Sequence, residues 1–400
     1  WEKLRLNLPT VPVHDLRVTD KDLVVGTMGR SAWILDDVAA LRTRSAVAET
    51  AKVHLFAPPP ATLWGIRSGA KLPGAGENPP HGATITYWLK EDAPASGVKI
   101  EILDGKGAVI AELQGEKPKD APPEPEVPES FPKRPLPAKK GMHRVTWNFA
   151  ELPPDRIPRG ALDAGNLSVG PRALPGRYVV RLSASGQKSN AALVLERDPR
   201  SAVSAEQLAE QHRFATTVKD DLGKLTYAVQ RIRLVRKQLA DRNGVLKETK
   251  TGKELVADSA KLIAALEDLE GKLHNPKAKV VYDILAFKGG AQLYSQMASL
   301  YSFATDAEGA PTQGMKEVFD GYRKRLGAAL DEVEKTFSGA VERNQALAAK
   351  GKLPGIVIPP AKKPAPEPEA PPRKQKPVEK KPKEKKKPKK NAPPKGSSGS

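Results

Sequence analysis

The spacing of apolar residues changes several times along the chain, and each change marks a boundary between segments of different predicted structure. Short apolar runs come first, alternation with a period of two follows, and a period of 3.6 residues takes over in the second half. The last part of the chain has no period. We therefore predict a multidomain α+β protein that is divided into residues 1–44, 45–80, 81–198, 199–353 and 354–400.

The first segment, residues 1–44, is typical of short antiparallel strands. His14–Val18 alternates in part, and the apolar runs Leu23–Thr27 and Ala32–Leu35 flank the turn Met28–Ser31. Short strands with tight turns indicate a β-propeller blade or a sandwich. One small sheet cannot bury both of its faces, so we expect this segment to need neighbouring sheets that this chain lacks.

Residues 45–80 are rich in proline and glycine, most clearly at Ala57–Pro60 and Gly74–Pro80. Proline runs favour extended backbone that makes no internal hydrogen bonds. We therefore predict a connector that wraps on a surface or crosses between domains.

Residues 81–198 return to the period of a strand. Ala83–Leu89 and Val98–Leu103 alternate, and the turn Asp104–Gly107 is typical of a hairpin. About seven strands with no helical period predict an immunoglobulin-like or fibronectin-III-like β-sandwich. A Pro- and Glu-rich insert, Lys117–Lys140, predicts a surface loop. The other predicted strands are Ala108–Ile110, His143–Phe149, Gly176–Leu182 and Ala191–Leu195.

Residues 199–353 have a helical period, and we predict an antiparallel helical bundle. Ser204 with Gln207, and Thr251 with Glu254, match the capping box that begins a helix. The first and last predicted helices are about forty residues long, and two shorter helices lie between them. The main stripe residues are Leu208, Ala215, Val218, Leu222, Leu225, Val229, Ile232, Val235 and Leu239, then Leu255, Leu262, Leu266, Leu269 and Leu273, then Leu293, Met297, Leu300 and Tyr301, and last Met315, Phe319, Tyr322, Leu326, Leu330, Val333, Phe337 and Val341.

Residues 354–400 contain mainly Pro, Lys, Glu and Ala, and we predict a disordered tail. The chain has 66 Lys and Arg against 47 Asp and Glu, a net charge of +19, and the last forty residues alone supply +10 of it. The lysine run Lys376–Lys390 has two interpretations: an arm that binds polyanions weakly and without specificity, or a solvated, self-repelling tail. No aromatic residue interleaves with the lysines, so base stacking is not expected and the solvated tail is the favoured interpretation.

Motifs that carry chemistry are missing from the sequence. The absence of cysteine excludes a disulfide framework, thiol catalysis and Cys-ligated zinc or iron–sulfur sites. Neither a phosphate-binding loop, a dinucleotide fingerprint, an EF-hand nor a nucleophile elbow occurs. No apolar run is long enough to span a membrane. No two histidines stand at metal-ligand spacing, so we predict no metal residues, and the missing motifs predict no catalytic or cofactor residues. The histidines are His14, His54, His81, His143, His212 and His274.

Two groups of residues have both a structural and a functional interpretation. Asp36 and Asp37 would be a carboxylate pair for glycoside hydrolysis, but adjacent strand residues face opposite ways, which favours a strand-ending turn. Tyr87, Trp88 and Trp147 either line a carbohydrate platform or pack in a sandwich core, and their alternating positions favour packing.

Several motifs stand in a fixed order: Asp22–Asp37 (DLVVGTMGRSAWILDD), Leu55–Pro58, Asn78–Ala83, Gly141–Trp147 with Pro175–Tyr178, Gly289–Leu293 and Ala310–Thr312. In this order they resemble the bacterial sortilin-type or neuraminidase-repeat (BNR-like) β-propeller proteins, which are often labelled glycosyl hydrolase-like. The resemblance covers residues 1–353. It implies a closing propeller blade in residues 1–44, an Ig-like sandwich similar to the flagellar-hook capping type, and a helical bundle.

The resemblance also implies a function and a location. The expected protein is exported, extracellular or periplasmic, and this chain is its C-terminal piece, because Trp1 opens within a strand-like segment. We expect a non-catalytic scaffold and interaction region whose partners are upstream propeller blades, other proteins or cell-surface polysaccharide. The alternative is part of a sialidase-like glycoside hydrolase with its active site upstream. The arginine triad and nucleophilic tyrosine of a sialidase have no counterpart in this sequence.

Overall fold

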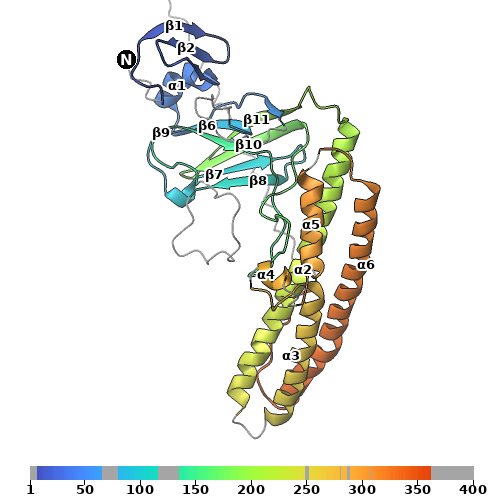
Figure 1. The fold of residues 1–400 in the computed structure, drawn as a ribbon. Coiled ribbons are helices and arrows are strands. Elements are labelled where there is room, and N and C mark those ends of the chain that lie inside the picture. The colour runs from blue at the N-terminus through green and yellow to red at the C-terminus, as the bar shows by residue number, and fades with distance from the viewer. Residues whose placement is uncertain are drawn as a thin grey trace, which may run out of the picture. The chain divides into compact units, whose positions relative to one another are not determined.

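The structure is a computed structural model, and it describes residues 7–64, 80–115, 135–247, 252–279, 281–285, 289–306 and 308–361 (Figure 1). These residues form an α+β fold, in which three sheets precede a group of helices. The mixed α+β class that the periodicity predicts is confirmed.

The N-terminal sheet consists of β1 (Val13–Val18), β2 (Leu23–Thr27) and β3 (Ala32–Leu35), antiparallel and in that order. The chain reverses between β2 and β3 because Gly29 takes a left-handed conformation with φ of +76°. Leu16 pairs with Val25, and Val25 pairs with Trp33. Because side chains alternate along strands, one face of the N-terminal sheet carries Leu16, Val18, Leu23, Val25, Trp33 and Leu35.

Two further sheets lie together and are called here the two-sheet domain (Figure 1). They share a single apolar core. One sheet has the order β4 (Val53–Leu55), β6 (Ala83–Leu89) and β9 (Gly141–Trp147). The other has the order β5 (Ala61–Leu63), β11 (Gln187–Arg197), β10 (Gly176–Ala184), β7 (Lys99–Leu103) and β8 (Val109–Gln114). Neighbouring strands are antiparallel except β5 and β11. A 3-10 turn, Ala95–Gly97, precedes β7.

The predicted connector, residues 45–80, differs from the structure. The helix α1 (Ala39–Thr50) crosses the predicted boundary at residue 44, and β4 and β5 both fall inside the connector. The strands are only three residues long, too short for a period to show, and each is extended by pairing with a distant strand. Residues 65–79 and most of the predicted loop Lys117–Lys140 lie outside the described residues.

The helices follow the predicted stripes closely. Ser204 caps α2, its side chain accepting a hydrogen bond from the Gln207 amide while the Gln207 side chain bonds back, so this capping box is confirmed. The second predicted box depends on Thr251, which is outside the described residues. The helices are α2 (Ala205–Leu246), α3 (Lys253–Leu273), α4 (Val281–Leu285), α5 (Leu293–Asp306), α6 (Gln313–Thr336), a π-helical turn (Phe337–Val341) and α7 (Glu342–Lys350).

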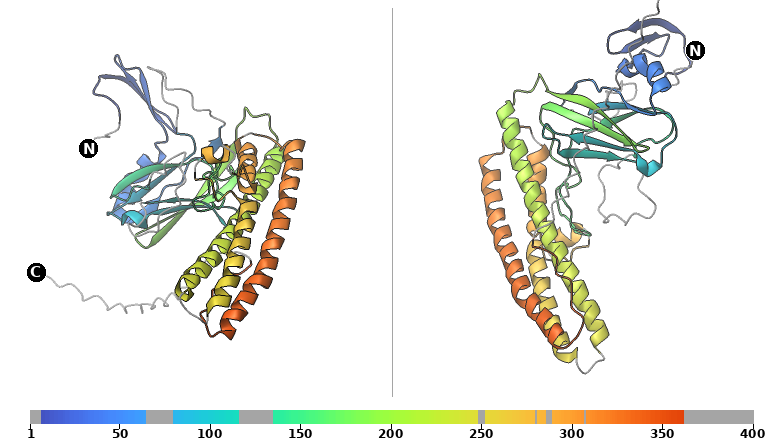
Figure 2. Two further views of the ribbon diagram at one scale, coloured as in Figure 1. Left: turned by 60° about the horizontal axis from the view of Figure 1, so that its bottom comes forward. Right: turned by 180° about the vertical axis from the view of Figure 1, so that it is seen from behind.

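The helical core contains residues from outside the predicted bundle. Helices α2, α3, α5 and α6 pack side by side, as Figure 2 shows from two further directions. Ile157 and Leu167, from the long loop between β9 and β10, are buried in the helical core. Gly165 in this loop has φ of +91°, and a Cβ there would lie 2.5 Å from the Ala298 carbonyl oxygen of α5. The period of the sequence changes near residue 199. The helical core, however, also contains residues that precede this boundary.

The predicted disordered tail, residues 354–400, also requires a correction. Residues 354–361, called here the strap, lie along α2, and Ile356 is buried in the helical core. Its three prolines and Gly355 give this segment the composition of a linker. Its packing against the helices therefore leaves no periodic pattern in the sequence. Residues 362–400, with the lysine run, lie outside the described residues.

Candidate functional site

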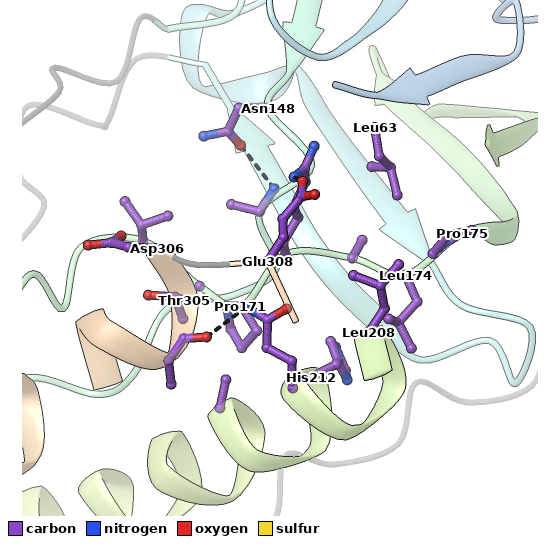
Figure 3. A pocket seen from close by; sticks show the side chains of 18 of the residues that line it. Leu63, Asn148, Pro171, Leu174, Pro175, Leu208, His212, Thr305, Asp306 and Glu308 are labelled. Atoms are coloured by element: carbon purple, nitrogen blue, oxygen red, sulfur yellow. Dashed lines mark hydrogen bonds and ion pairs between the residues drawn. The ribbon is translucent and has the colours of Figure 1, made fainter. Parts of the chain in front are cut away.

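A pocket of about 700 Å³ lies where the two-sheet domain meets the helices. Its walls come from both parts of the chain (Figure 3): Leu63, Leu174 and Pro175 belong to the two-sheet domain, and Leu208, His212 and Thr305 belong to α2 and α5. A pocket of this size at a domain junction is the usual place for a small ligand. We call it the junction pocket.

Arg172 is the central charged residue of the junction pocket. One of its terminal nitrogens, Nη1, donates to Glu308 Oε1 at 2.7 Å, and Nη2 donates to the main-chain oxygen of Trp64 at 2.7 Å. The other carboxylate oxygen of Glu308 accepts a hydrogen bond from Ser201 Oγ at 3.3 Å. Arg200 lies 4.7 Å from the centre of the Trp64 ring. The guanidinium of Arg172 therefore joins three segments of the chain.

Two neighbouring residues of α2 hold the other side of the junction. Nε2 of His212 lies 2.7 Å from Glu151 Oε1, and both side chains are largely buried. Gln211 donates from Nε2 to the Ala304 carbonyl at 2.9 Å and accepts from the Gly309 amide at 3.3 Å. Because α2 begins at the capped Ser204, these side chains stand two turns into the helix, level with the loop that follows β9.

Several polar side chains of the junction pocket are already hydrogen-bonded within the chain. Arg172, Glu308, Gln211 and His212 each bond to another segment of the chain. Nε2 of His212 is bonded to the Glu151 carboxylate, so this nitrogen is not paired with a serine hydroxyl as in nucleophilic catalysis. These four side chains therefore tie the two-sheet domain to the helices.

A second polar cluster lies inside the helical bundle and was missed by the sequence analysis. Glu270 of α3 accepts from Arg233 Nε at 2.7 Å and from Arg236 Nη1 at 2.5 Å, both on α2. Nε2 of His274 lies 2.9 Å from Glu270 Oε1 and 2.8 Å from Arg233 Nη2. The spacing of Glu270 and His274, four residues apart on one helix, was the available signal.

The electrostatics of this cluster favour ionised Glu270. Burial by itself would raise the pKa of Glu270, but the hydrogen bonds from His274 and Arg233, and their charges, outweigh it and lower the pKa to about 2. The Arg233 Nη1 also donates to the Pro158 carbonyl at 2.6 Å, so the cluster reaches the loop between β9 and β10. Its role is to hold α2, α3 and that loop together.

The N-terminal sheet presents an apolar face that the described residues leave partly open. Leu16 and Val18 on the edge strand β1 are 56% and 59% exposed, while Val25 on the central strand is 8% exposed. All three lie on the same face. Solvent-exposed apolar side chains at the open edge of a sheet are typical of a docking surface.

The residues singled out from the sequence have structural positions. The main-chain oxygens of Asp36 and Asp37 accept from Arg144 at 2.7 and 2.6 Å, so this pair anchors the N-terminal sheet to β9. Tyr87 and Trp147 are buried in the core of the two-sheet domain, which confirms the packing interpretation for them. Trp88 is half-buried on the opposite face of β6, with Arg44 6.0 Å from its ring centre.

The six histidines do not come together. His54 stacks edge-on against Phe56, and His143 lies beside Tyr87. His81 lines the junction pocket, where its Nε2 is 2.9 Å from the Trp64 carbonyl oxygen. Over the described ranges, no three His, Asp or Glu side chains are grouped as ligands for a metal ion.

Comparisons with known proteins give no family. No protein-family model matches the chain, and no curated protein matches it. Among solved structures, CopC from Methylosinus trichosporium OB3b aligns with 30% of this chain and 81% of its own, at 13% sequence identity and a TM-score of 0.16, too low to carry an argument. In the part of the chain that the structure describes, no helix is long and apolar enough to cross a membrane.

Proposed function

We propose that this chain is the non-catalytic C-terminal scaffold and interaction region of an exported, BNR-like β-propeller protein. In this proposal the N-terminal sheet is the last blade of the propeller, and the two-sheet domain is an Ig-like sandwich. The partner of the N-terminal sheet is the neighbouring blade of the same protein, located in the extracellular or periplasmic space.

The observation that carries the proposal is the open apolar face of the N-terminal sheet. Leu16 and Val18 lie on the face that also bears the buried Val25, and both are more than half exposed. Burying a Leu and a Val side chain against a neighbouring sheet contributes about 1.5–3 kcal/mol each. Propeller blades pack face to face in this way, and the resemblance of Asp22–Asp37 to a closing blade supports the same partner.

The junction pocket supports a scaffold rather than a catalytic role for this chain. Its residues Arg172, Glu308 and His212 are used in contacts between the two-sheet domain and the helices. A catalytic site instead needs polar groups aimed at a substrate.

Hydrogen exchange at β1 tests the proposal. The amides of residues 13–18 should exchange quickly in this chain and at least about tenfold more slowly in the gene product extended upstream of Trp1, because a covering blade reduces opening of the sheet. The double variant Leu16→Lys with Val18→Lys should remove that protection. Met28→Lys, at an exposed turn position, is the control and should leave it unchanged.

Two results would contradict the proposal. One is equal exchange at β1 in the short and the extended protein. The other is an upstream reading frame that encodes no repeated blade sequences.

A further inference from the structure

The strap is bound to the helices mainly through its main chain. Gln238 of α2 donates from Nε2 to the Val357 carbonyl at 2.9 Å and accepts from the Val357 amide at 2.8 Å. Gln345 of α7 makes the same pair of bonds to Ile356, at 2.7 and 2.8 Å. Each glutamine amide therefore satisfies one residue of the strap as a neighbouring β-strand would.

Other contacts extend the same pattern along α2. Arg242 donates to the Pro354 carbonyl at 3.2 Å, and Tyr227 donates to the Pro360 carbonyl at 3.1 Å. Arg231 donates to the carbonyls of Pro359 and Ala361. The α2 residues stand at 227, 231, 238 and 242, spacings of four and seven that place them on one face of the helix.

The lengths of the two partners match. The α helix rises about 22 Å over the fifteen residue steps from Tyr227 to Arg242. Polyproline-like extended chain spans about 19 Å over the six residue steps from Pro354 to Pro360. A small molecule would reach only part of this row of donors, whereas an extended peptide reaches all of it.

Ile356 is the only side chain of the strap that is buried. Ile356 is 8% exposed and lies in the helical core, while its neighbour Val357 is 71% exposed. Tyr227 adds an aromatic ring to these donors, and the buried Phe337 ring lies 4.4 Å from the Arg231 guanidinium that donates to the strap. Aromatic side chains and hydrogen-bond donors of this kind recognise Pro-rich extended peptides.

We infer that the face formed by α2 and α7 is a binding site for extended Pro-rich peptides, and that the strap is its occupant within the chain. The ligand class is a peptide with a branched aliphatic residue in the place of Ile356 and a Pro-Pro pair three and four residues after it. A partner protein that carries such a segment would compete with the strap. This inference is independent of the proposed function.

The inference is tested with a variant of the full-length chain in which the strap no longer occupies the site. Ile356→Asp places a charge in the apolar position and should expel the strap, because a buried unpaired carboxylate is strongly disfavoured. A fluorescein-labelled peptide of residues 353–361, with the wild-type sequence, should then bind this variant saturably, as measured by fluorescence anisotropy. The wild-type chain should bind the peptide at least about tenfold more weakly, because its own strap competes at high effective concentration.

Matched variants separate specific from accidental binding. Val357→Asp changes an exposed position and should behave like the wild-type chain. Adding Gln238→Ala and Gln345→Ala to Ile356→Asp should weaken peptide binding about tenfold or more, since four hydrogen bonds are lost. Adding Gln313→Ala, which removes an exposed glutamine of α6, should not. Absence of peptide binding by a folded Ile356→Asp chain would overturn the inference, as would binding that survives loss of both glutamines.

A second measurement decides the case if Ile356→Asp does not fold. In the wild-type chain the amide protons of Ile356 and Val357 should exchange more slowly than in the free peptide, and Gln238→Ala with Gln345→Ala should remove the difference. Exchange at the free-peptide rate in the wild-type chain would reject the binding site.

Discussion

The guanidinium of Arg172 and the carboxylate of Glu308 form an ion pair at 2.7 Å, although the two residues are 136 positions apart. Arg172 precedes β10 and Glu308 follows α5, so the pair joins the two-sheet domain to the helices. Arg172 also donates to the Trp64 carbonyl, which adds a third segment to the same junction.

Arg172→Ala should lower the free energy of unfolding by about 1–3 kcal/mol, because it leaves a carbonyl and a carboxylate without their donor. A double-mutant cycle with Glu308→Ala, measured by chemical denaturation, should give a coupling energy of about 0.5–1 kcal/mol for this partly exposed pair. Arg172→Lys keeps the charge but loses the two-pronged geometry, and should fall between the wild type and Arg172→Ala. A coupling energy of zero would show that the pair does not link the two parts.

Glu270 should make the stability of the protein depend on acid. Its pKa is about 2 in the folded state against 4.5 for an ordinary glutamate. A lowered folded pKa contributes stability that is fully present above the unfolded pKa and is lost as the pH falls toward 2. The contribution at neutral pH is about 3 kcal/mol, and urea denaturation between pH 7 and pH 2 measures its loss.

Variants at Glu270 and at an exposed partner separate this effect from general acid unfolding. Glu270→Gln should cost roughly 3–5 kcal/mol at pH 7, because it removes the buried carboxylate that half-buried Arg233 and Arg236 share, and the gap to the wild type should narrow as the pH falls. Glu332→Gln, which removes an ion pair to Lys272 that is half exposed on both sides, should change stability by about 0–1 kcal/mol. An unchanged gap between wild type and Glu270→Gln at pH 7 and pH 2 would disprove the assignment.

Ile157 tests whether the loop between β9 and β10 is part of the helical core. Ile157→Ala should lower the free energy of unfolding by about 2–5 kcal/mol, because the side chain is fully buried among helical residues. Leu152→Ala is the control in the same loop, since Leu152 is exposed, and should cost about 0.5 kcal/mol or less. Thermal or urea denaturation measures both variants. Equal losses of stability for the two substitutions would place Ile157 outside the core.

Removal of residues 362–400 tests the two interpretations of the lysine run. A polyanion-binding arm would give the full chain weak heparin binding, with an affinity that falls steeply between about 50 and 200 mM salt, whereas a solvated tail would give none. The chain that ends at Ala361 should not bind, because 14 of the basic residues are gone. Binding that is unchanged by the deletion would locate the polyanion contact in the body of the protein.

The helical half of the fold was predictable because its signal is local. Stripe residues from Val218 to Leu239 are buried as the 3.6-residue period predicts, and Ser204 begins α2 as its capping box predicts. Strands β2, β3 and β6 likewise match their predicted bounds. In each case the side chains that face the core are set by the repeat of the secondary structure itself.

The sites were not predictable, because their members are brought together by chain reversals. Arg172 meets Glu308, and Glu151 meets His212, only after the loop between β9 and β10 lies on α2 and α5. The strap shows the same limit: a Pro-rich segment has no period, yet Gln238 and Gln345 bind its main chain. The bonds to the strap use main-chain amide and carbonyl groups, which hardly depend on residue type. The sequence of the strap therefore gives no signal for them.

The sequence alone determined the order of the longer elements, the apolar face of those with a clear period, and the concentration of positive charge in the last forty residues. These follow from periods of 2 and 3.6 and from composition. The tertiary structure decided which loop entered which core, which charges were paired, and which apolar face of the N-terminal sheet remained open. Those outcomes depend on long-range packing, whose free energy comes from burying side chains that lie far apart in the chain.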